Sequence, residues 1–595
     1  MNGNPGRESL RRWQAGKTRN YFSSNGNLQR VLRLLAGADS AAAMKRRLED
    51  FGATIAADVD PLVCESERPE NAPRLRSWSG IGEPIEEIEL HPSTREAGRL
   101  VWRHGILAVQ GERGRCLEQA AMIYMLCHLG EGGHACPVAC TAGLIKALQQ
   151  HGSPGLQRDY LTRLLDTDYD TVHLGSQFLT EVQGGSDVGA NLVEATPENA
   201  ADGTWRIRGE KWFCSVANAD QFFVTARVAG RAAGTGGLGA FLVPRRLEDG
   251  SLNGFRIRRL KTKLGTRAMA SGEIDFDNAL AYGIGAPEDG FKIAAGLVLN
   301  TSRWVNALGS TGVMRRAYLE AVSYAASREA FGKPILQYPL VRETLASMKC
   351  EEHAALASTL YLSVLLDRTE TGKADAHERA IFRFLVNANK YATSIAASEV
   401  AHGALEVLGG NGAIEDFSVV PRLLRDNFVF ESWEGTHNVL AMQILRDGTR
   451  LAIFPNVHDE LVTLLEGIEG DELRGEVPAL VERLTELSAR IARSLASPEH
   501  GATHFRRQLT ELSRLFQAVR LLWEADHERA GGDGKAKTAV AQFFIRRHLL
   551  PAYRPEDDPR WRERIDAILL EDIAGEGFAA PLREKGPNAG GGRSA

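Results

Sequence analysis

The sequence predicts a mostly helical α+β protein in which a β-domain lies between two helical regions. Apolar residues recur with helical spacing up to about residue 170 and again after about residue 290. Between about residues 171 and 283, short apolar runs are instead separated by glycine, asparagine and aspartate, a pattern typical of strands. The length of 595 residues exceeds what one hydrophobic core usually serves, so several domains are expected.

Residues 1–170 form the predicted N-terminal helical domain. Stretches such as LQRVLRLLAGA and CLEQAAMIYMLCHLG carry its helical signal, and a proline-rich stretch over 63–92 is expected to be a loop between helices. No apolar run follows the first arginines, and no run of about 18 apolar residues occurs in the chain. We therefore expect a cytoplasmic protein that does not insert into a membrane.

Residues 171–285 form the predicted middle domain, a β-barrel or β-sandwich. The runs WRIRGEKWF, FFVTARV and GAFLVPRR have the length and composition of short strands. Helical spacing returns in residues 286–455, the predicted C-terminal helical bundle, where Met314, Tyr318 and Ala325 fall on one helix face.

Residues 456–585 form a predicted helical extension beyond the bundle. Two leucine-rich stripes, one through Leu484 and Leu487 and one through Leu509 and Leu512, give it the pattern of packed amphipathic helices. The final stretch, residues 586–595, reads GPNAGGGRSA and is too polar and glycine-rich to pack, so we expect a disordered tail.

Overall composition indicates small-molecule ligands. The chain is 43% hydrophobic and 25% charged, with a formal net charge of -5, so it has no global attraction to nucleic acid or to an anionic membrane. Its 7 cysteines are scattered and odd in number, which favours reduced thiols over a disulfide framework. The stretch HLGEGGHACPVAC fits no standard zinc spacing, so we expect no metal site.

Three short motifs could contribute to a cofactor site. FLTEVQGGSDV (178–188) offers free backbone N–H groups and hydroxyls in a turn after a strand, although such a turn more often only joins strands. GEKWFCSVAN (209–218) places Phe213 and Ser215 on one strand face, which could wall a flat ring or belong to the core. SREAFGKP (327–334) breaks a helix at Gly332 and Pro334 and carries two cations.

The most specific pattern lies in residues 408–440, LGGNGAIEDFSVVPRLLRDNFVFESWEGTHNVL. A Gly-Gly-Asn-Gly turn is followed by one helix and then by Glu434, a lone carboxylate before a second, apolar helix. Apolar neighbours such as Trp433 would desolvate this carboxylate and raise its pKa, as a general base requires. The alternative is that Glu434 only begins a helix.

Taken in order, TEVQGGSDV, GEKWFCSV, SREAFGKP, VLGGNG and WEGT resemble the acyl-CoA dehydrogenase superfamily over about residues 95–447. EIELHP (87–92), SWEGTHNVLAMQILR and the long C-terminal extension resemble its alkylation-response, AidB-type branch more narrowly. The resemblance implies an N-terminal helical domain, a middle β-domain and a C-terminal helical bundle. It also implies FAD as cofactor and a homodimer or homotetramer.

The resemblance assigns roles to particular residues. Glu434 is implied as the base that removes the α-proton of an acyl-CoA. From the same chain, the implied FAD contacts are Phe178, Leu179, Thr180, Gly185, Ser186, Phe213, Cys214, Ser215, Trp433, Thr436 and Asn438. From a neighbouring subunit they are Arg328, Phe331, Gly409 and Gly410.

The leading hypothesis is therefore FAD-dependent dehydrogenation of an acyl-CoA, with electrons passed to an electron-transfer flavoprotein or a similar acceptor. The alternative is a DNA-associated flavoprotein of the alkylation response with weak or vestigial dehydrogenase activity. Trp433, Phe213 and the pair Tyr338 and Pro339 depart from the main dehydrogenases and place the chain nearer that branch. A flavin oxidase or monooxygenase is disfavoured, because those tend to lose the glutamate of the EGT motif. DNA binding is not favoured, since residues 456–595 carry a net charge of -4.

Overall fold

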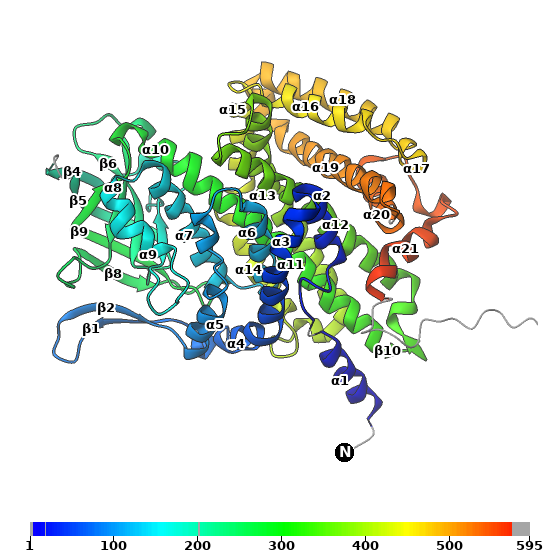
Figure 1. Cartoon of the computed structure of the whole chain (residues 1–595), viewed down its shortest axis with the longest axis horizontal. Coiled ribbons are helices and arrows are strands. Elements are labelled where there is room, and N and C mark those ends of the chain that lie inside the picture. The colour runs from blue at the N-terminus through cyan, green and yellow to red at the C-terminus, as the bar shows by residue number, and fades with distance from the viewer. Residues whose placement is uncertain (1–3, 18, 200–202, 533, 574–595) are drawn as a thin grey trace, which may run out of the picture.

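The computed structural model describes residues 4–17, 19–199, 203–532 and 534–573. A β-domain occupies one end, the C-terminal extension the other, and long helices run between them (Figure 1). Within those ranges no helix is both long and apolar enough to cross a membrane. The tail predicted at 586–595 and the last residues of the predicted extension lie outside the described residues.

The N-terminal region is helical, as predicted, but the proline-rich stretch is not simply a loop. It contains a hairpin in which Leu75 pairs with Ile88, and Ile257 N donates to Glu86 Oε2 at 2.8 Å, which joins the hairpin to the β-domain. The missed signal is a pair of short strand-like runs, RLRSW and PIEEIE, on the two sides of the glycine-containing turn SGIGE. The elements are α1 (Pro5–Lys17), α2 (Gly26–Ala36), α3 (Ala38–Thr54), α4 (Asp60–Ser66), β1 (Arg74–Trp78), β2 (Pro84–Glu89), α5 (Pro92–Trp102), α6 (Cys116–Leu126), α7 (Gly132–His151), α8 (Pro154–Leu156) and α9 (Thr162–Leu164).

The middle region is a closed β-barrel. Strand pairing runs β4–β5–β9–β7–β6 and returns to β4, with β3 added beside β6 and β8 beside β9. Most pairs are antiparallel, whereas β6 pairs in parallel with β3 and β4. Closure removes exposed strand edges and fixes the ends of β3 and β5, which carry the motifs. The strands are β3 (Gly175–Phe178), β4 (Glu194–Asn199), β5 (Thr204–Ser215), β6 (Gln221–Val228), β7 (Leu238–Pro244), β8 (Phe255–Leu260) and β9 (Ser271–Gly283).

The bundle is built around α11, in which 26 of 29 residues are buried. Met314, Tyr318 and Ala325 are buried as predicted, but the helix has no solvent face because other elements cover it on all sides. It ends at Ser327, before the predicted break at Gly332, and a small hairpin follows. The elements are α10 (Gly290–Ile293), α11 (Leu299–Ser327), β10 (Glu329–Ala330), β11 (Lys333–Pro334), α12 (Pro339–Glu370), α13 (Ala376–Leu408), α14 (Val420–Ser432) and α15 (His437–Gly448).

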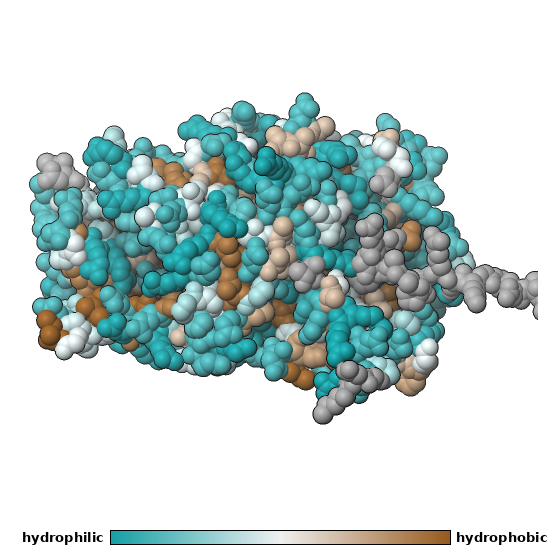
Figure 2. All heavy atoms as spheres, turned by 60° about the horizontal axis from the view of Figure 1, so that its bottom comes forward, coloured by the Kyte–Doolittle hydropathy of each residue, from teal (hydrophilic) through white to brown (hydrophobic). Residues whose placement is uncertain are grey.

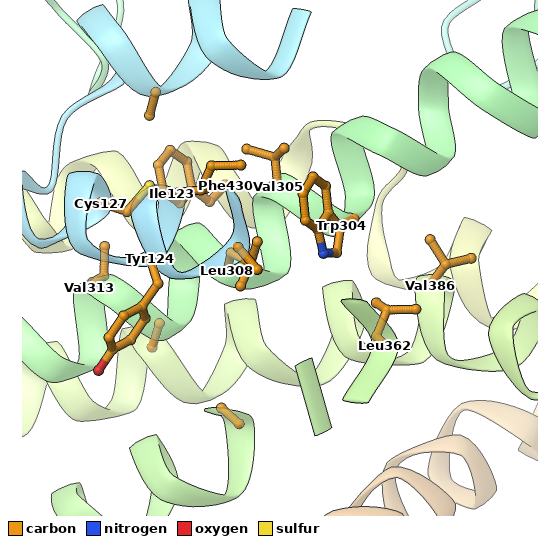
Figure 3. Close-up of a cluster of buried hydrophobic side chains, with 14 of the residues drawn as sticks. Ile123, Tyr124, Cys127, Trp304, Val305, Leu308, Val313, Leu362, Val386 and Phe430 are labelled. Carbon is orange, nitrogen blue, oxygen red and sulfur yellow. The ribbon is translucent and has the colours of Figure 1, made fainter. Parts of the chain in front are cut away.

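Apolar packing joins the N-terminal helices to the bundle. Figure 3 shows Tyr124 from α6, Trp304 and Leu308 from α11, Leu362 from α12 and Val386 from α13 in one cluster, and all five are buried. Such a core holds the helices in fixed relative positions, because each side chain fills space left by its neighbours. Any group projecting from α11 or α13 is therefore rigidly placed.

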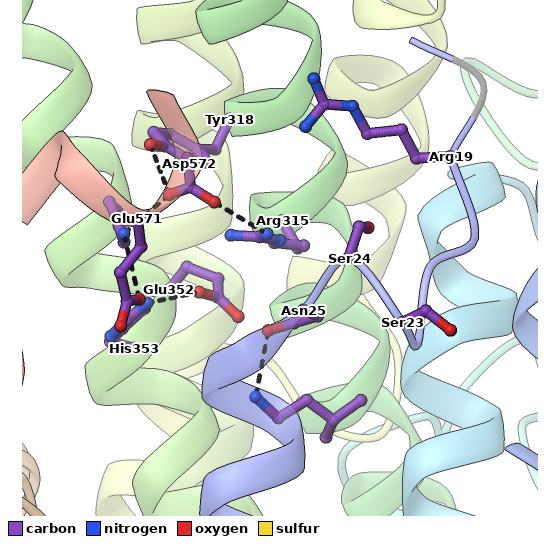
Figure 4. A network of polar contacts seen from close by, with 12 residues as sticks. Arg19, Ser23, Ser24, Asn25, Arg315, Tyr318, Glu352, His353, Glu571 and Asp572 are labelled. Atoms are coloured by element: carbon purple, nitrogen blue, oxygen red, sulfur yellow. Dashed lines mark hydrogen bonds and ion pairs between the residues drawn. The ribbon is translucent and has the colours of Figure 1, made fainter. Parts of the chain in front are cut away.

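The extension packs on the bundle through α19, which contacts α12, α13 and α15. The predicted leucine stripes are confirmed, since Leu484, Leu487, Leu509 and Leu512 are buried. At its end, Asp572 accepts a hydrogen bond from Tyr318 and pairs with buried cations of α11 and α12 (Figure 4). Its helices are α16 (Ile453–Glu466), α17 (Asp471–Arg474), α18 (Val477–Ala496), α19 (Pro498–Ala530), α20 (Lys535–Leu549) and α21 (Trp561–Ile573).

Candidate active site

Glu434 lies in the turn between α14 and α15, which we call the catalytic turn (residues 431–436). Its φ of 57° falls in the left-handed region that side-chain-bearing residues rarely adopt, and Gly435 follows with φ 111°. Such backbone costs about 1–3 kcal/mol and gathers at functional sites. The surroundings of the turn must therefore stabilise this conformation.

Two buried cations hold the catalytic turn. Arg303 of α11 donates from Nε to the Glu434 carbonyl oxygen at 2.9 Å, and its Nη1 donates to Asn387 Oδ1 at 2.7 Å. Lys390 of α13 donates from Nζ to the carbonyl oxygens of Glu431 and Gly435, at 2.8 Å and 2.9 Å. Both cations project from the rigid bundle, so they fix the turn against α11 and α13.

The same burial changes the titration of these groups. Burial raises the pKa of the Glu434 carboxyl, and the charges of Arg303 and Lys390 oppose part of that rise. Burial also lowers the pKa of Lys390 to about 7 and that of Arg303 to about 10. Among the residues described by the structure, none donates a hydrogen bond to the Glu434 carboxylate. Its lone pairs are therefore available for a proton, as a general base requires.

Glu434 borders a narrow cavity of about 30 Å³ between the N-terminal helices, α11 and α14. Its wall is mostly apolar and includes Cys127, Cys140, Val305, Phe430 and Trp433. Three of these, Cys127, Val305 and Phe430, lie together in Figure 3. A hydrocarbon group entering here would displace water from the carboxylate, which strengthens a base of this kind.

The first predicted cofactor loop follows β3. Phe178 is fully buried and packs on Phe222 with ring centroids 4.9 Å apart, so its side chain belongs to the barrel core. Leu179 and Thr180 are partly buried, whereas Gly185 and Ser186 are exposed. The loop therefore offers its backbone and the hydroxyls of Thr180 and Ser186 to a ligand.

A buried ion pair that the sequence reasoning missed organises this loop. Lys211 Nζ lies 2.7 Å from Glu181 Oε1, and both side chains are almost completely buried. Lys211 also donates to the Leu179 carbonyl at 3.1 Å, while Glu181 accepts from the backbone N–H groups of Leu192 and Val193. The glutamate of TEVQGGSDV and the lysine of GEKWF thus tie the two motifs together.

On β5, alternation separates the predicted flavin-facing residues. Phe213 is 54% exposed and Ser215 is partly buried, and the pairing of β5 with β9 is irregular between Lys211 and Cys214. Cys214 points inward and is fully buried, so its side chain packs in the barrel and only its backbone is left for a ligand. Lys261 Nζ lies 3.4 Å from the Trp212 ring centroid and 4.8 Å from that of Phe213. This cation holds the two aromatic rings in place.

Two residues that follow Glu434, Thr436 and Asn438, are exposed at the start of α15. Thr436 is the N-cap residue but makes no side-chain capping bond, so the first N–H groups of α15 are left for another acceptor. Asn438 Oδ1 accepts from Arg506 Nη1 of α19 at 2.9 Å. The C-terminal extension therefore contacts the segment directly beside the catalytic turn.

Arg328, Phe331, Gly409 and Gly410 lie far from Glu434 in the same chain. Arg328 follows the last residue of α11, 25 residues after Arg303, which places it about 37 Å away along the helix. Phe331 is 96% exposed with φ 51°, and both glycines are exposed. Figure 2, which brings the lower side of Figure 1 forward, shows hydrophobic residues in separate patches on that face. A single chain does not bring these four residues to Glu434.

The two histidines of the stretch HLGEGGHACPVAC, for which no metal site was expected, contact other groups of the protein. His134 lies 3.0 Å from Glu131 Oε1 and 3.0 Å from the Thr94 carbonyl oxygen, and His128 lies 2.8 Å from the Tyr124 carbonyl oxygen. Cys136 and Cys140 lie on α7 with their sulfurs 3.8 Å apart. In the described part of the chain, no cluster of three or more histidine, cysteine or acidic side chains is arranged to hold a metal ion.

Arg303 and Lys390 were also missed, and a weak signal for each exists. Each is the single charged residue of a helical segment, TSRWVNAL for Arg303 and VNANKYATS for Lys390. A buried cation is typically paired or bound to buried carbonyls. That signal indicates a buried polar site but does not name its partner.

Comparison with known proteins agrees with this geometry. Residues 14–171 match the adaptive response protein AidB N-terminal domain, residues 176–279 the acyl-CoA dehydrogenase middle domain and residues 288–449 the acyl-CoA dehydrogenase C-terminal domain. AidB of Escherichia coli (strain K12) is 34% identical over 448 residues, covering 72% of this chain and 77% of AidB. Acyl-CoA dehydrogenase family member 11 of Caenorhabditis elegans is 32% identical over 449 residues, covering 73% and 71%. The structure of Caenorhabditis elegans ACDH-11 in complex with C11-CoA superposes with a TM-score of 0.83 at 26% identity, covering 94% of this chain and 96% of that one.

Proposed function

Because this chain belongs to the acyl-CoA dehydrogenase family, we propose that it is an FAD-dependent dehydrogenase of an acyl-CoA thioester in which Glu434 removes the α-proton. The observation that carries the proposal is the partly buried carboxylate of Glu434, free of hydrogen-bond donors from the described residues and bordering an apolar cavity. An α-proton of a thioester is weakly acidic. Its removal therefore needs a desolvated base at short range.

The roles of this chain's residues follow from their positions. The apolar cavity wall binds the acyl group and excludes water, and the carboxylate of Glu434 receives the proton. Arg303 and Lys390 hold the catalytic turn, and their charges limit the rise of the Glu434 pKa. When bound, FAD supplies the hydride acceptor for the β-hydrogen.

The residues around β3, β5 and α15 fit a flavin dinucleotide. Phe213 and Ser215 present an aromatic ring and a hydroxyl on one accessible face, which suits a flat heteroaromatic group. The exposed turn at Gly185 and Ser186 and the uncapped N-terminus of α15 at Thr436 offer N–H donors of the kind that bind phosphate. We assign FAD to this surface and the acyl group to the cavity beside it.

A second copy of the chain completes the flavin site in this proposal. Arg328, Phe331, Gly409 and Gly410 carry the family's motifs but lie at the far end of α11 from their own Glu434. Two chains packed so that this end of one meets the β-domain of the other would supply both sets. The proposed assembly is thus a homodimer or homotetramer, and reduced FAD would pass its electrons to a separate flavoprotein.

The match to the AidB N-terminal domain supports a second candidate, a DNA-associated flavoprotein of the alkylation response. Surface charge supports the dehydrogenase instead. Residues 456–595 carry a net charge of -4. Of the adjacent arginines 546 and 547, Arg546 already forms ion pairs with Glu476 and Asp558. DNA affinity depends on cations free to neutralise phosphates.

One experiment tests the leading proposal. The purified protein with its bound flavin is mixed anaerobically with a panel of acyl-CoA thioesters of different chain length and branching. Bleaching of the flavin absorbance by one class supports the proposal and identifies that class. A protein that holds FAD but is bleached by none of them, while binding duplex DNA tightly, would favour the second candidate.

A further inference from the structure

The cavity beside Glu434 is apolar except at a few atoms, and two of these are unusual. Asn306 of α11 and Trp433 of the catalytic turn both line the cavity. Asn306 is 8% exposed, and its Nδ2 donates to the Phe430 carbonyl oxygen at 3.1 Å. This bond orients the amide and leaves Oδ1 on its other side.

Asn306 Oδ1 is buried and accepts no hydrogen bond from any residue that the structure describes. The indole Nε1 of Trp433 is likewise buried, and within the same described ranges nothing accepts from it. The Trp433 ring packs edge-on against Phe430, with centroids 5.2 Å apart and planes at 84°, so it is held in this orientation. Two residues of the cavity wall thus carry one buried acceptor and one buried donor that have no partner among the described residues.

Buried polar atoms of this kind are costly when left unpaired. Each unsatisfied donor or acceptor costs about 1–3 kcal/mol, so folded proteins usually pair them. In a binding cavity, such atoms are satisfied by the ligand or by water that the ligand displaces. A purely hydrocarbon acyl group would displace that water and leave both atoms unpaired.

We propose that the acyl group taken by this site carries a hydroxyl, which donates to Asn306 Oδ1 and accepts from Trp433 Nε1. A hydroxyl provides one donor and at least one acceptor in a single small group, which matches the two wall atoms. This inference rests on the proposed function, because it specifies the substrate of the same site.

The two unpaired atoms should allow the site to discriminate between a hydroxylated acyl group and its hydrocarbon isostere. A site built to bond a hydroxyl rejects the isosteric hydrocarbon strongly, because the hydrocarbon leaves buried polar groups without partners. With two such atoms, the hydroxylated ligand is expected to bind at least about tenfold more tightly than its hydrocarbon isostere. Asn306 and Trp433 then act as specificity-determining residues.

The test uses unreactive CoA thioethers, in which a CH₂ group replaces the thioester carbonyl, so that binding is measured without turnover. Two isosteric pairs cover two hydroxyl positions: S-(4-hydroxybutyl)-CoA with S-pentyl-CoA, and S-(3-hydroxybutyl)-CoA with S-(3-methylbutyl)-CoA. Titration calorimetry with the flavin-loaded protein gives each Kd. We expect at least about tenfold tighter binding of the hydroxylated member in one pair.

Three variants separate specificity from packing. Asn306→Leu preserves volume but removes the acceptor, and Trp433→Phe removes the donor, so each should bring the Kd ratio of the preferred pair close to one. The control Val305→Ala changes the cavity wall without removing a polar atom and should weaken both members alike. Flavin content and melting temperature identify variants that fail to fold, and either polar variant suffices for the test.

The outcomes distinguish this inference from the function on which it rests. Equal or tighter binding of the hydrocarbon member in both pairs overturns the hydroxyl assignment and leaves the dehydrogenase proposal in place. A preference that persists undiminished in both Asn306→Leu and Trp433→Phe also overturns it. If no thioether binds and no acyl-CoA bleaches the flavin, the proposed function itself fails.

Discussion

The catalytic turn and the surfaces assigned to FAD are built in opposite ways. Around Glu434, Arg303 of α11 and Lys390 of α13 donate to the backbone of the turn, and both cations are buried in the helical bundle. Around Phe213, Ser186, Phe331 and Gly409 the residues are exposed, and half of them lie at the other end of α11. In the proposed function, the fold of one chain thus positions Glu434, whereas a second chain completes the flavin surface.

This difference separates two kinds of mutational effect. A change at Glu434, or at a cation that holds the catalytic turn, should alter chemistry and pH dependence while leaving flavin binding intact. A change on the exposed surfaces should alter flavin affinity and assembly while leaving the base unchanged.

The largest expected effect is that of Glu434→Gln. Glutamine keeps the shape of glutamate but does not accept the proton, so turnover should fall by about 10²–10⁴. Flavin content should stay unchanged. The matched control is Glu431→Gln in the same turn, because the Glu431 side chain bonds to Ser398 and not to the cavity. That control should stay within a few-fold of wild type, and loss of flavin in Glu434→Gln would contradict the separation of the two regions.

Next in size is Lys390→Met, which leaves the Glu431 and Gly435 carbonyl oxygens without their donor. We expect turnover to fall by about 10–100-fold, since a misplaced base loses much of its effect. Removing this cation also removes one influence that lowers the Glu434 pKa. The base acts when ionised, so the wild-type rate falls as pH drops through the raised pKa, and in Lys390→Met this fall should begin at higher pH.

A second lysine, which is partly buried, provides the control for that experiment. Lys263 donates to Ser271 Oγ at 2.9 Å, and burial lowers its pKa to about 8, but neither its bonds nor its charge reaches Glu434. Lys263→Met should therefore change stability without moving the acidic limb of the pH–rate profile, measured as kcat/KM from pH 5 to 9. An equal shift in both variants would mean that the limb reports global stability.

A smaller effect, on affinity and not on chemistry, is expected from Arg328→Ala. Arg328 is exposed and its side chain has no partner among the residues that the structure covers, so the variant should fold normally. Flavin affinity should fall about tenfold, as expected for losing a charge-assisted bond to a phosphate. Flavin release on dilution and the mass of the assembly measure the two consequences.

Mixing two defective variants sharpens this test. If Arg328 serves the flavin of the neighbouring chain, a mixed assembly of Glu434→Gln and Arg328→Ala chains contains one site with both residues intact. Activity should then reappear on mixing, although each variant alone is impaired. If Arg328 served its own chain, every site in the mixture would keep one defect and no activity would return.

The sequence alone predicted the features that depend on local patterns but not those that depend on contacts between distant segments. The helical regions, the β-domain and the leucine stripes were predicted because their signals are local periodicities. The position of Glu434 followed from a local motif, and its raised pKa from apolar neighbours. Arg303 and Lys390 were not predicted, because their partners are backbone carbonyls 131 and 41 or more residues away. The all-round burial of α11 and the hairpin in the proline-rich stretch likewise depend on packing between distant segments.

Arg506→Ala should have a still smaller effect and tests whether the extension supports the site. Arg506 is exposed and donates to Asn438 at 2.9 Å, and its charge helps to lower the pKa of His437, which burial brings to about 4. An exposed bond of this kind contributes about 0.5–1.5 kcal/mol, so flavin affinity should fall only a few-fold. The neighbouring Arg507→Ala is the control and should leave it unchanged. Equal effects would assign the loss to general surface charge.

The smallest expected effect is the binding of plain duplex DNA to the protein, which should be weak or absent at physiological salt. The reason is electrostatic: the affinity of non-specific binding comes from cations that replace counterions at phosphates. Residues 456–595 have a net charge of -4, and Arg546 lies 2.8 Å from Glu476 and 3.1 Å from Asp558, so its guanidinium is already neutralised. Arg506 and Arg507 are exposed but form only a small patch.

Fluorescence anisotropy over a range of salt concentrations measures the binding. Submicromolar affinity with a steep salt dependence would require a basic surface formed between chains. It would then assign DNA recognition, in addition to flavin binding, to the exposed surfaces.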